Sequence, residues 1–398
     1  MQGSSDSPPA HAGAGPWVRL RSGTAHPFIY RRMIASVDPA AKPGDVVTVY
    51  GKGGELFGHG FWHDRSQIAL RMLNWDATPI DDAFFRGRLE QAVRWRERLL
   101  AGQDTNVCRL VHAEGDGLSG LIAERYDDVI VIEVFALAIF RRLEMLQRLL
   151  TELTGITRFA VRADERIERL EGFRIPLHAG DELPPTLTVR ENGLRFRVDV
   201  RTGHKTGFFC DQRENRRRLA GFCAGAEVLD VCCYTGGFGV YAATHGHAAT
   251  VSGVDLDEDA VAMATKNAHL NDARIQHVHA DAFSYLRQMQ TNGRGYDVIV
   301  LDPPKFVANR EEFHDGSHKY VDLNALAMSV LRPGGVLLTC SCSGTVGRDD
   351  FIGMVKAAAN RVRRSLQIVD QTGAAPDHPI MANCPESGYL KAVWARVG

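Results

Sequence analysis

The second half of the chain alternates short apolar runs with longer segments in which apolar residues recur every three or four positions. The longer segments predict helices, for example at 258–270 and 320–331. The apolar runs predict strands at residues 227–233, 250–255, 276–281, 296–302 and 335–341. Alternating strands and helices indicate an α/β fold with a parallel, doubly wound sheet, in which ligands bind at the carboxyl ends of the strands.

Residues 17–75 have a different pattern, in which short β-type runs are separated by turns rich in Gly, Pro and Asp. Short strands at this close spacing favour a small β-barrel. The clearest runs lie at 45–50, 56–62 and 68–73. The next segment, 81–100, has helical spacing, and Asp81 or Asp82 would cap such a helix.

The region between the barrel and the sheet mixes strands and helices in a less regular order, which favours a small α+β domain. Its predicted elements are strands at 118–125, 128–135 and 159–162 and a helix at 141–153. The Pro184-Pro185 step is a natural boundary to the sheet. We therefore expect an N-terminal extension (1–16), a barrel with its connecting helix (17–95), a central α+β domain (96–190) and the α/β domain (191–398).

Composition and charge exclude several classes of protein. The 398 residues are 44% hydrophobic and 24% charged, as in ordinary globular proteins, and the net charge of −1 excludes a uniformly basic nucleic-acid-coating protein. The barrel region, 17–95, is mildly basic with a net charge of +3, whereas residues 96–190 carry −3. These counts leave room for a local basic face on the barrel.

Eight cysteines are spread over the chain without any C-x-x-C pair. This argues against a disulfide framework and a structural zinc site and fits the reducing cytosol. The most apolar run, 129–140, is interrupted by Glu133 and is too short to span a bilayer, and residues 1–16 lack the apolar core of a secretion signal. We therefore expect a cytoplasmic protein, without a metal or a membrane partner, that is a monomer or a homodimer.

A glycine-containing turn follows the first strand of the α/β region. The run 227–233 leads into Tyr234-Thr235-Gly236-Gly237-Phe238-Gly239, where glycines would let a ligand approach the backbone. The spacing is neither the G-x-G-x-x-G of dinucleotide-binding enzymes nor a P-loop, so a nicotinamide oxidoreductase is disfavoured. By itself, the turn would also suit an ordinary strand-to-helix connection.

Acidic residues at the ends of four consecutive strands favour a ligand over an ordinary turn. After Asp230 in the first strand, Asp255 closes the second and could accept both hydroxyls of a ribose. Asp281 ends the third and could accept an adenine amino group, and Asp302 ends the fourth in the sequence Asp302-Pro303-Pro304-Lys305. Four carboxylates in these places are hard to explain by surface solubility alone.

These residues resemble the successive motifs of class I S-adenosylmethionine-dependent methyltransferases, which have a Rossmann-like sheet. More specifically, four segments resemble the RlmI family, which methylates C5 of a cytosine in large-subunit ribosomal RNA: 203–213, 233–238, 302–306 and 341–344. Residues 26–30 and the strands after them resemble that family's N-terminal PUA domain, a small RNA-binding barrel. Residues 114–120 resemble the start of its central α+β domain, so the resemblance covers nearly the whole chain.

The resemblance implies S-adenosylmethionine as the cofactor and ribosomal RNA as the partner. The expected cofactor-binding residues are Asp211, Arg213, Asp230, Tyr234, Thr235, Gly236, Gly237, Asp255, Leu256, Asp281, Ala282 and Asp302. Lys205 could pair with the methionine carboxylate or an RNA phosphate, and His204 is more consistent with a loop residue than with a catalytic base. The alternative for the segment around them is a helix-entry loop with solvated charges.

Methylation at cytosine C5 requires a cysteine, because C5 becomes nucleophilic only after a thiolate adds to C6. Cys342, at the end of the fifth strand, is the expected nucleophile, and Asp302 is the expected partner of cytosine N3. Cys340 points to the same face of the strand, and we expect it to pack as a small apolar residue. Lys305 stands where many RNA cytosine methyltransferases carry a second cysteine, so the sequence does not define the base that removes the C5 proton.

Two further features have no defined role at this point. The aromatic residues Trp17, Phe28, Trp62 and Trp75 could stack on RNA bases, although aromatic residues of a small barrel more often form its core. Asp377-His378-Pro379 resembles a late loop of the same family.

Two other functions remain as alternatives. Asp302-Pro303-Pro304 also resembles the (Asn/Asp)-Pro-Pro motif with which amino-directed methyltransferases hold an exocyclic amine of guanine or adenine, and that chemistry needs no cysteine. A non-catalytic RNA-binding ribosome-assembly factor would keep the barrel but would not bind the cofactor.

Overall fold

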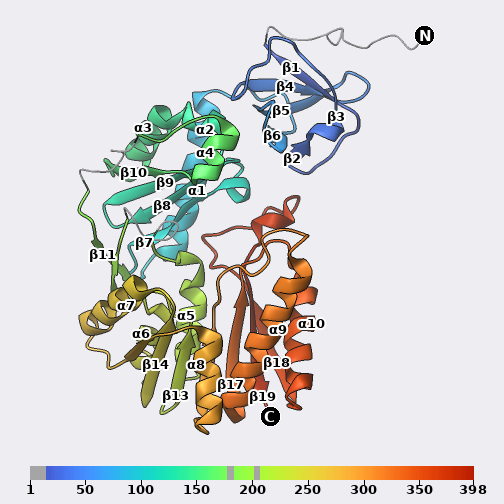
Figure 1. Cartoon of the computed structure of the whole chain (residues 1–398). Coiled ribbons are helices and arrows are strands. Elements are labelled where there is room, and N and C mark those ends of the chain that lie inside the picture. Colours follow the sequence, from blue (N-terminus) through green and yellow to red (C-terminus); the bar gives the residue numbers. More distant parts are fainter. Residues whose placement is uncertain (1–14, 177–182, 201–206) are drawn as a thin grey trace. The chain divides into compact units, whose positions relative to one another are not determined.

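The computed structural model describes residues 15–176, 183–200 and 207–398, which form two compact units (Figure 1). The N-terminal unit consists of the chain up to Leu187, a short stretch near residue 200, and Asp377–Ser387. The C-terminal unit consists of the remaining described residues. A late segment of the sequence therefore belongs to the N-terminal unit.

The predicted barrel strands are present as a six-stranded sheet in the order β2-β6-β5-β4-β1-β3. β1 pairs with β4 in parallel, and the other neighbours are antiparallel. The strands are β1 (Trp17–Leu20), β2 (Phe28–Tyr30), β3 (Ile34–Val37), β4 (Val46–Tyr50), β5 (Leu56–Trp62) and β6 (Ile68–Asn74). Inward residues such as Val18, Val47 and Leu70 form the core of this sheet together with Trp62.

A helix and a four-stranded sheet follow. Helix α1 (Asp82–Leu100) is capped by Asp81, one of the two predicted caps, which accepts a hydrogen bond from Phe84 N at 3.0 Å. The sheet has the order β10-β9-β8-β7 and confirms an α+β arrangement. Its strands are β7 (Val107–His112), β8 (Leu121–Tyr126), β9 (Val129–Val134) and β10 (Arg158–Arg162), with helices α2 (Leu137–Phe140), α3 (Leu143–Thr154) and α4 (Glu165–Glu171).

The C-terminal unit contains the predicted parallel sheet, with seven strands in the order β15-β14-β13-β16-β17-β19-β18. β19 pairs antiparallel with both β17 and β18, and the other neighbouring strands pair in parallel. The strands are β13 (Glu227–Val231), β14 (Thr250–Asp255), β15 (Gln276–His279), β16 (Tyr296–Leu301), β17 (Leu331–Ser341), β18 (Leu366–Thr372) and β19 (Lys391–Val397). The helices are α5 (Arg213–Ala220), α6 (Gly237–Ala243), α7 (Glu258–Leu270), α8 (Ala282–Thr291), α9 (Phe313–Val330) and α10 (Arg348–Arg361), and β11 (Leu187–Glu191) pairs separately with β12 (Leu194–Val198).

The predicted element ends are wrong in several places, for local reasons. β13 ends two residues before the predicted position because Cys232 has a left-handed backbone with φ 61°. β8 begins three residues late because the chain turns at Gly117 and Gly120, both with positive φ. α9 begins at Phe313, seven residues before the predicted start. β18 and β19 were not predicted.

Apolar side chains cover both faces of the C-terminal sheet. In β13, Val228 packs in one core cluster and Leu229 in the other, and in β16 Val300 and Leu301 divide in the same way. Burial on both faces is typical of parallel strands and leaves the strand ends for polar chemistry. None of the helices in the described residues combines the length and the apolar character that crossing a membrane requires.

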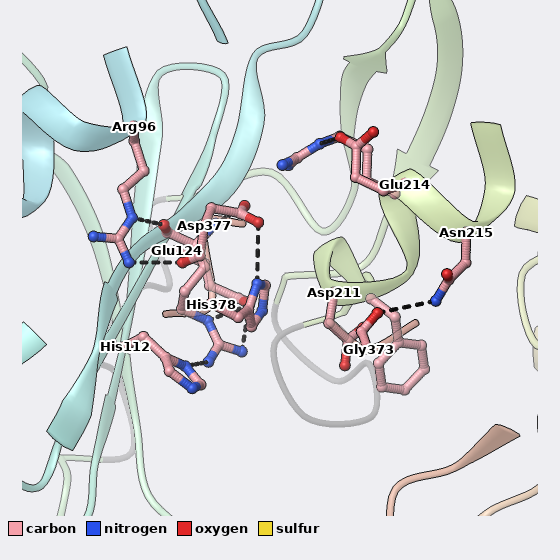
Figure 2. A network of polar contacts seen from close by, with 12 residues as sticks. Arg96, His112, Glu124, Asp211, Glu214, Asn215, Gly373, Asp377 and His378 are labelled. Carbon is pink, nitrogen blue, oxygen red and sulfur yellow. Dashed lines mark hydrogen bonds and ion pairs between the residues drawn. The ribbon is translucent and has the colours of Figure 1, made fainter. Parts of the chain in front are cut away.

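A buried arginine of the N-terminal unit connects α1 and the nearby β7 region to Asp377, which is distant in the sequence (Figure 2). Arg96, on α1, is 1% exposed and binds both carboxylate oxygens of Asp116 at 2.7 and 2.8 Å. Its guanidinium also donates to Arg109 O at 2.8 Å and to Asp377 O at 2.6 Å. Asp377 in turn accepts a hydrogen bond from Arg109 N at 3.0 Å. The loop that begins at Asp377 is therefore anchored to α1 and β7.

We expect Arg96→Met to destabilise the N-terminal unit by about 3–5 kcal/mol, because it leaves a buried carboxylate and two carbonyl groups without their donor. Urea unfolding measures this loss. Arg94→Met is the matched control, since Arg94 lies on the same helix with a 74% exposed side chain that pairs only with Glu90 among the ion pairs of the described residues. Equal losses of stability in the two variants would contradict the role assigned to Arg96.

Candidate active site

The loop after β13 is held by two carboxylates. Cys232, Tyr234 and Gly236 have φ values of 61°, 48° and 80°, so the chain turns sharply between β13 and α6. Asp230 Oδ2 accepts a hydrogen bond from Gly239 N at 3.0 Å, and Asp255 Oδ2 accepts one from Tyr234 N at 2.7 Å. These bonds fix the glycine turn that the sequence singled out.

Asp230 differs from the other three carboxylates, because it lies within β13 and is 1% exposed. Burial raises its pKa to about 7, and the nearby carboxylates of Asp302 and Asp255 act in the same direction. Its Oδ1 atom is buried and has no hydrogen-bond partner among the described residues. The second oxygen is therefore available to a donor that the protein does not supply there.

The ends of β14 and β15 present a carboxylate beside an apolar side chain. Asp255 Oδ1 accepts a hydrogen bond from Asp257 N at 3.0 Å, and the next residue, Leu256, is 66% exposed. Asp281 caps α8 by accepting from Ser284 N at 2.9 Å, which places Ala282 at the start of that helix. An exposed leucine next to these acids suits a ligand with a flat apolar ring and polar edges.

Asp302 follows β16 and is fixed by a chain of hydrogen bonds. Gln212 Nε2 donates to Asp302 Oδ2 at 3.0 Å, and Gln212 Oε1 accepts from Asn215 at 2.6 Å. Asn215 also donates to Gly373 O at 3.2 Å (Figure 2) and accepts from Thr372 Oγ1 at 2.7 Å. Gln212 was not among the predicted site residues, although it lies between two of them, Asp211 and Arg213.

The two cysteines of β17 have different surroundings. Cys340 is fully buried in an apolar cluster, as predicted, and burial raises the pKa of its thiol well above the usual value. Cys342 follows the last residue of the strand and is partly exposed. β17 pairs in parallel with β16, and Thr339 lies opposite Leu301, so Asp302 and Cys342 both follow neighbouring strands at the same edge.

A buried tyrosine on α9 connects these two strand ends. Tyr320 Oη accepts a hydrogen bond from Ser341 Oγ at 3.0 Å and lies 3.0 Å from Ser343 Oγ. Ser343 Oγ also accepts from Val307 N at 3.2 Å, in the loop after Asp302. The residues around the proposed nucleophile are therefore tied to the loop that carries Asp302. Nothing in the sequence pattern marked Tyr320.

The predicted site residues that precede or begin α5 differ in how the structure describes them. Asp211 is 7% exposed and accepts a hydrogen bond from Tyr389 Oη at 2.6 Å, while its Oδ1 is buried without a partner among the described residues. Arg213 is 1% exposed and donates to Glu214 at 3.2 Å. His204 and Lys205 lie outside the described residues.

The four aromatic residues of the barrel that could stack on RNA bases differ in exposure. Trp17 and Trp62 are each 5% exposed, in agreement with a role in the core. Trp75 is 39% exposed and donates to Thr24 O at 3.2 Å. Phe28 is partly buried below the guanidinium of Arg71, 5.4 Å from its ring centre.

Comparison with known families agrees with this geometry. Residues 108–396 match the model of S-adenosylmethionine-dependent methyltransferases, and residues 14–75 match the model of PUA-like domains. The chain belongs to the S-adenosylmethionine-dependent methyltransferase family. The methyltransferase match covers both the central domain and the parallel sheet.

Curated relatives narrow the assignment to one branch of the methyltransferase family. Proteins named ribosomal RNA large subunit methyltransferase I are 39% identical to this chain in both Shewanella amazonensis and Shewanella denitrificans, over 94% of this chain and 95% of theirs. The chain therefore also belongs to the RlmI family, as its motifs indicated.

Solved structures confirm the fold of this methyltransferase. A methyltransferase crystallised with S-adenosylhomocysteine superposes with a TM-score of 0.79 over 94% of this chain and 96% of its own, at 20% identity. A Streptococcus mutans protein described as S-adenosylmethionine-dependent has a TM-score of 0.80 and covers 95% of this chain and 100% of its own, at 19% identity.

The cofactor of this methyltransferase is S-adenosylmethionine, and the residues present fit it. The fixed glycine turn, the unpartnered oxygen of Asp230 and the exposed Leu256 offer close backbone approach, a buried acceptor and an apolar surface. A nucleoside with a polar, charged tail needs these three features together.

In the cofactor-free protein, Asp230→Asn should change how stability depends on pH. With a pKa of about 7 in the folded state and 3.8 as the ordinary value, the wild-type carboxyl favours folding below about pH 4, and this contribution is lost as the pH rises to about 7. Asparagine does not titrate and can still accept the Gly239 N–H. The stability of the variant relative to wild type should therefore rise between about pH 4 and pH 7 and then stay constant, as measured by urea unfolding; a pH-independent difference would contradict the burial effect.

Proposed function

We propose that this methyltransferase forms 5-methylcytosine in large-subunit ribosomal RNA, with Cys342 as the nucleophile. Its RlmI relatives are named for the ribosomal RNA of the large subunit. The observation that carries the chemistry is the sheet edge at which Asp302 and a partly exposed Cys342 follow the neighbouring strands β16 and β17.

In the proposed reaction, the Cys342 thiolate forms a bond to C6 of the cytosine, and the electron pair displaced from the C5–C6 bond makes C5 nucleophilic. S-adenosylmethionine supplies the methyl group as an electrophile. Asp302, as the carboxylic acid, donates its proton in a hydrogen bond to N3 and so stabilises the electron density that accumulates on the ring. Loss of the C5 proton then breaks the S–C6 bond and returns the thiolate. The target base must leave its stack to reach this edge.

We assign the cofactor-binding roles according to the chemistry of each residue. Asp255 would accept the ribose hydroxyls, Leu256 would contact the adenine ring, and Asp281 with Ala282 would lie at its amino edge. Asp230 with the turn Tyr234-Thr235-Gly236-Gly237 would border the sulfonium and methionine part. Asp211 and Arg213 would serve the methionine end, and Asp302 would face both cofactor and base.

RNA binding would fall to the PUA-like barrel, which is the mildly basic part of the chain, and to the central domain. The near-neutral net charge gives no strong long-range attraction, so affinity should depend on local contacts and on salt. Ribosomal RNA as a substrate also fits the cytoplasmic location expected from the cysteines. Methylation of an exocyclic amine through Asp302-Pro303-Pro304 is the competing chemistry.

Cys342→Ala should abolish methyl transfer to undermodified ribosomal RNA, because no group is left to activate C5, while binding of S-adenosylmethionine persists. The assay uses methyl-labelled cofactor, digestion to nucleosides and mass spectrometry. Cys340→Ala, two residues earlier and buried, is the matched control and should retain transfer. Label on a guanine or adenine amine together with full activity of Cys342→Ala would establish the amino-directed reaction instead.

Asp302→Asn should lower kcat by about 10²-fold or more, because the amide still accepts the Gln212 hydrogen bond but has no acidic proton to transfer to N3. Single-turnover transfer measures the rate, and calorimetry measures cofactor binding. We expect cofactor binding to change much less than kcat. An unchanged rate would remove Asp302 from the chemical step.

A further inference from the structure

Lys391 is a buried cation beside the strand end that carries Cys342. It begins β19, which pairs antiparallel with β17, and lies opposite Ser341, the residue just before Cys342. Lys391 is 5% exposed. Lysine is rarely buried to this extent without a partner of opposite charge.

Two main-chain carbonyl groups hold the amine in place. Lys391 Nζ donates to Ser343 O at 2.6 Å and to Tyr389 O at 2.8 Å. Within the described part of the chain, no carboxylate forms an ion pair with Lys391. An ammonium group has three donors, so one N–H remains beyond these two bonds. The bond to Ser343 O also fixes the backbone immediately after Cys342.

The charged and titratable groups around Lys391 and Cys342 come from four parts of the fold. Burial lowers the pKa of Lys391 to about 8, Cys342 just after β17 raises it, and Arg348 on α10 and Lys305 after β16 lower it. From α9, Tyr320 also interacts electrostatically with Cys342. Of the three groups that act on Lys391, only Cys342 is negative when it ionises. The thiolate is therefore the natural counter-ion of the buried ammonium.

We propose that Lys391 is a positioning residue that holds Cys342 as a thiolate and fixes the strand end from which it attacks. The proposal rests on the proposed function of Cys342. The thiol proton leaves to solvent, the sulfur keeps the electron pair, and this pair forms the bond to C6. The ammonium neither gains nor loses a proton in this step, and it contributes by its charge and by its hold on Ser343.

The test measures the thiol itself, in the full-length protein without RNA or cofactor. Short pulses of iodoacetamide across a pH series, followed by peptide mass spectrometry, give the pH midpoint of Cys342 alkylation. The wild-type midpoint should lie below that of an ordinary thiol, about 8.5. Lys391→Met should raise the midpoint by about one pH unit, and Lys391→Arg, which keeps the charge, should raise it by less.

Two controls separate this effect from a general disturbance of the fold. Lys356→Met removes an exposed lysine of α10 and should leave the midpoint unchanged. Cys340 is an internal control, since its burial should keep it unreactive in every variant that folds.

An unchanged midpoint in a folded Lys391→Met variant would overturn the proposal. If that variant does not fold, the wild-type curve decides, and a midpoint at or above about 8.5 would overturn the proposal equally. Failure of the proposed function has a different signature, because methyl transfer would then survive Cys342→Ala whatever the alkylation midpoint is.

Discussion

Parallel pairing of β16 with β17 is the constraint on which the proposed active-site chemistry depends. It brings Asp302 and Cys342, which are forty residues apart in sequence, to one edge of the sheet. Both strands are buried on both faces, so their register is strongly fixed. A slip of one residue would turn Ser341 and Ser343 away from Tyr320 and bury polar side chains in apolar clusters. The packing of the core thus sets the geometry of the proposed active site.

The side chains that position Asp302 form a connected series of hydrogen bonds. Asp302 is held by Gln212, which is held by Asn215, which accepts from Thr372, and Trp394 donates in turn to Thr372 at 2.9 Å. Each side chain is a hydrogen-bond partner of the next. These bonds remove the cost of burying an unpaired polar group and fix the direction of the Asp302 carboxylate. A carboxylate oriented before the substrate binds needs little rearrangement in the transition state. The same logic explains why Asp255 holds the backbone of the glycine turn.

The sequence predicted the features that periodicity and local motifs encode, namely five strands of the large sheet, three strands of the barrel, a helix cap at Asp81 or Asp82, and the burial of Cys340. It failed where the decisive partner is distant in the chain. β18 carries few apolar residues in alternation, so its place beside β19 depends on the fold. Gln212, Tyr320 and Lys391 have no local pattern, because their roles arise only when their elements pack around β16 and β17. The predicted strand placed Asp230 three residues before its end, whereas the early turn at Cys232 leaves Asp230 one residue before the end of β13.

The presence of a cysteine therefore does not by itself identify a nucleophile in this chain. The surroundings of each thiol decide whether it can act as one. Burial raises the pKa of Cys223 and Cys384 to about 12 and that of Cys340 well above its usual value, which makes these thiols poor attackers near neutral pH. Cys342 differs in being partly exposed and in having a cation on the next strand. That cation arrives with β19, the one strand that runs against the others. In addition to completing the sheet, this antiparallel strand brings a positive charge to the strand end that carries the proposed nucleophile.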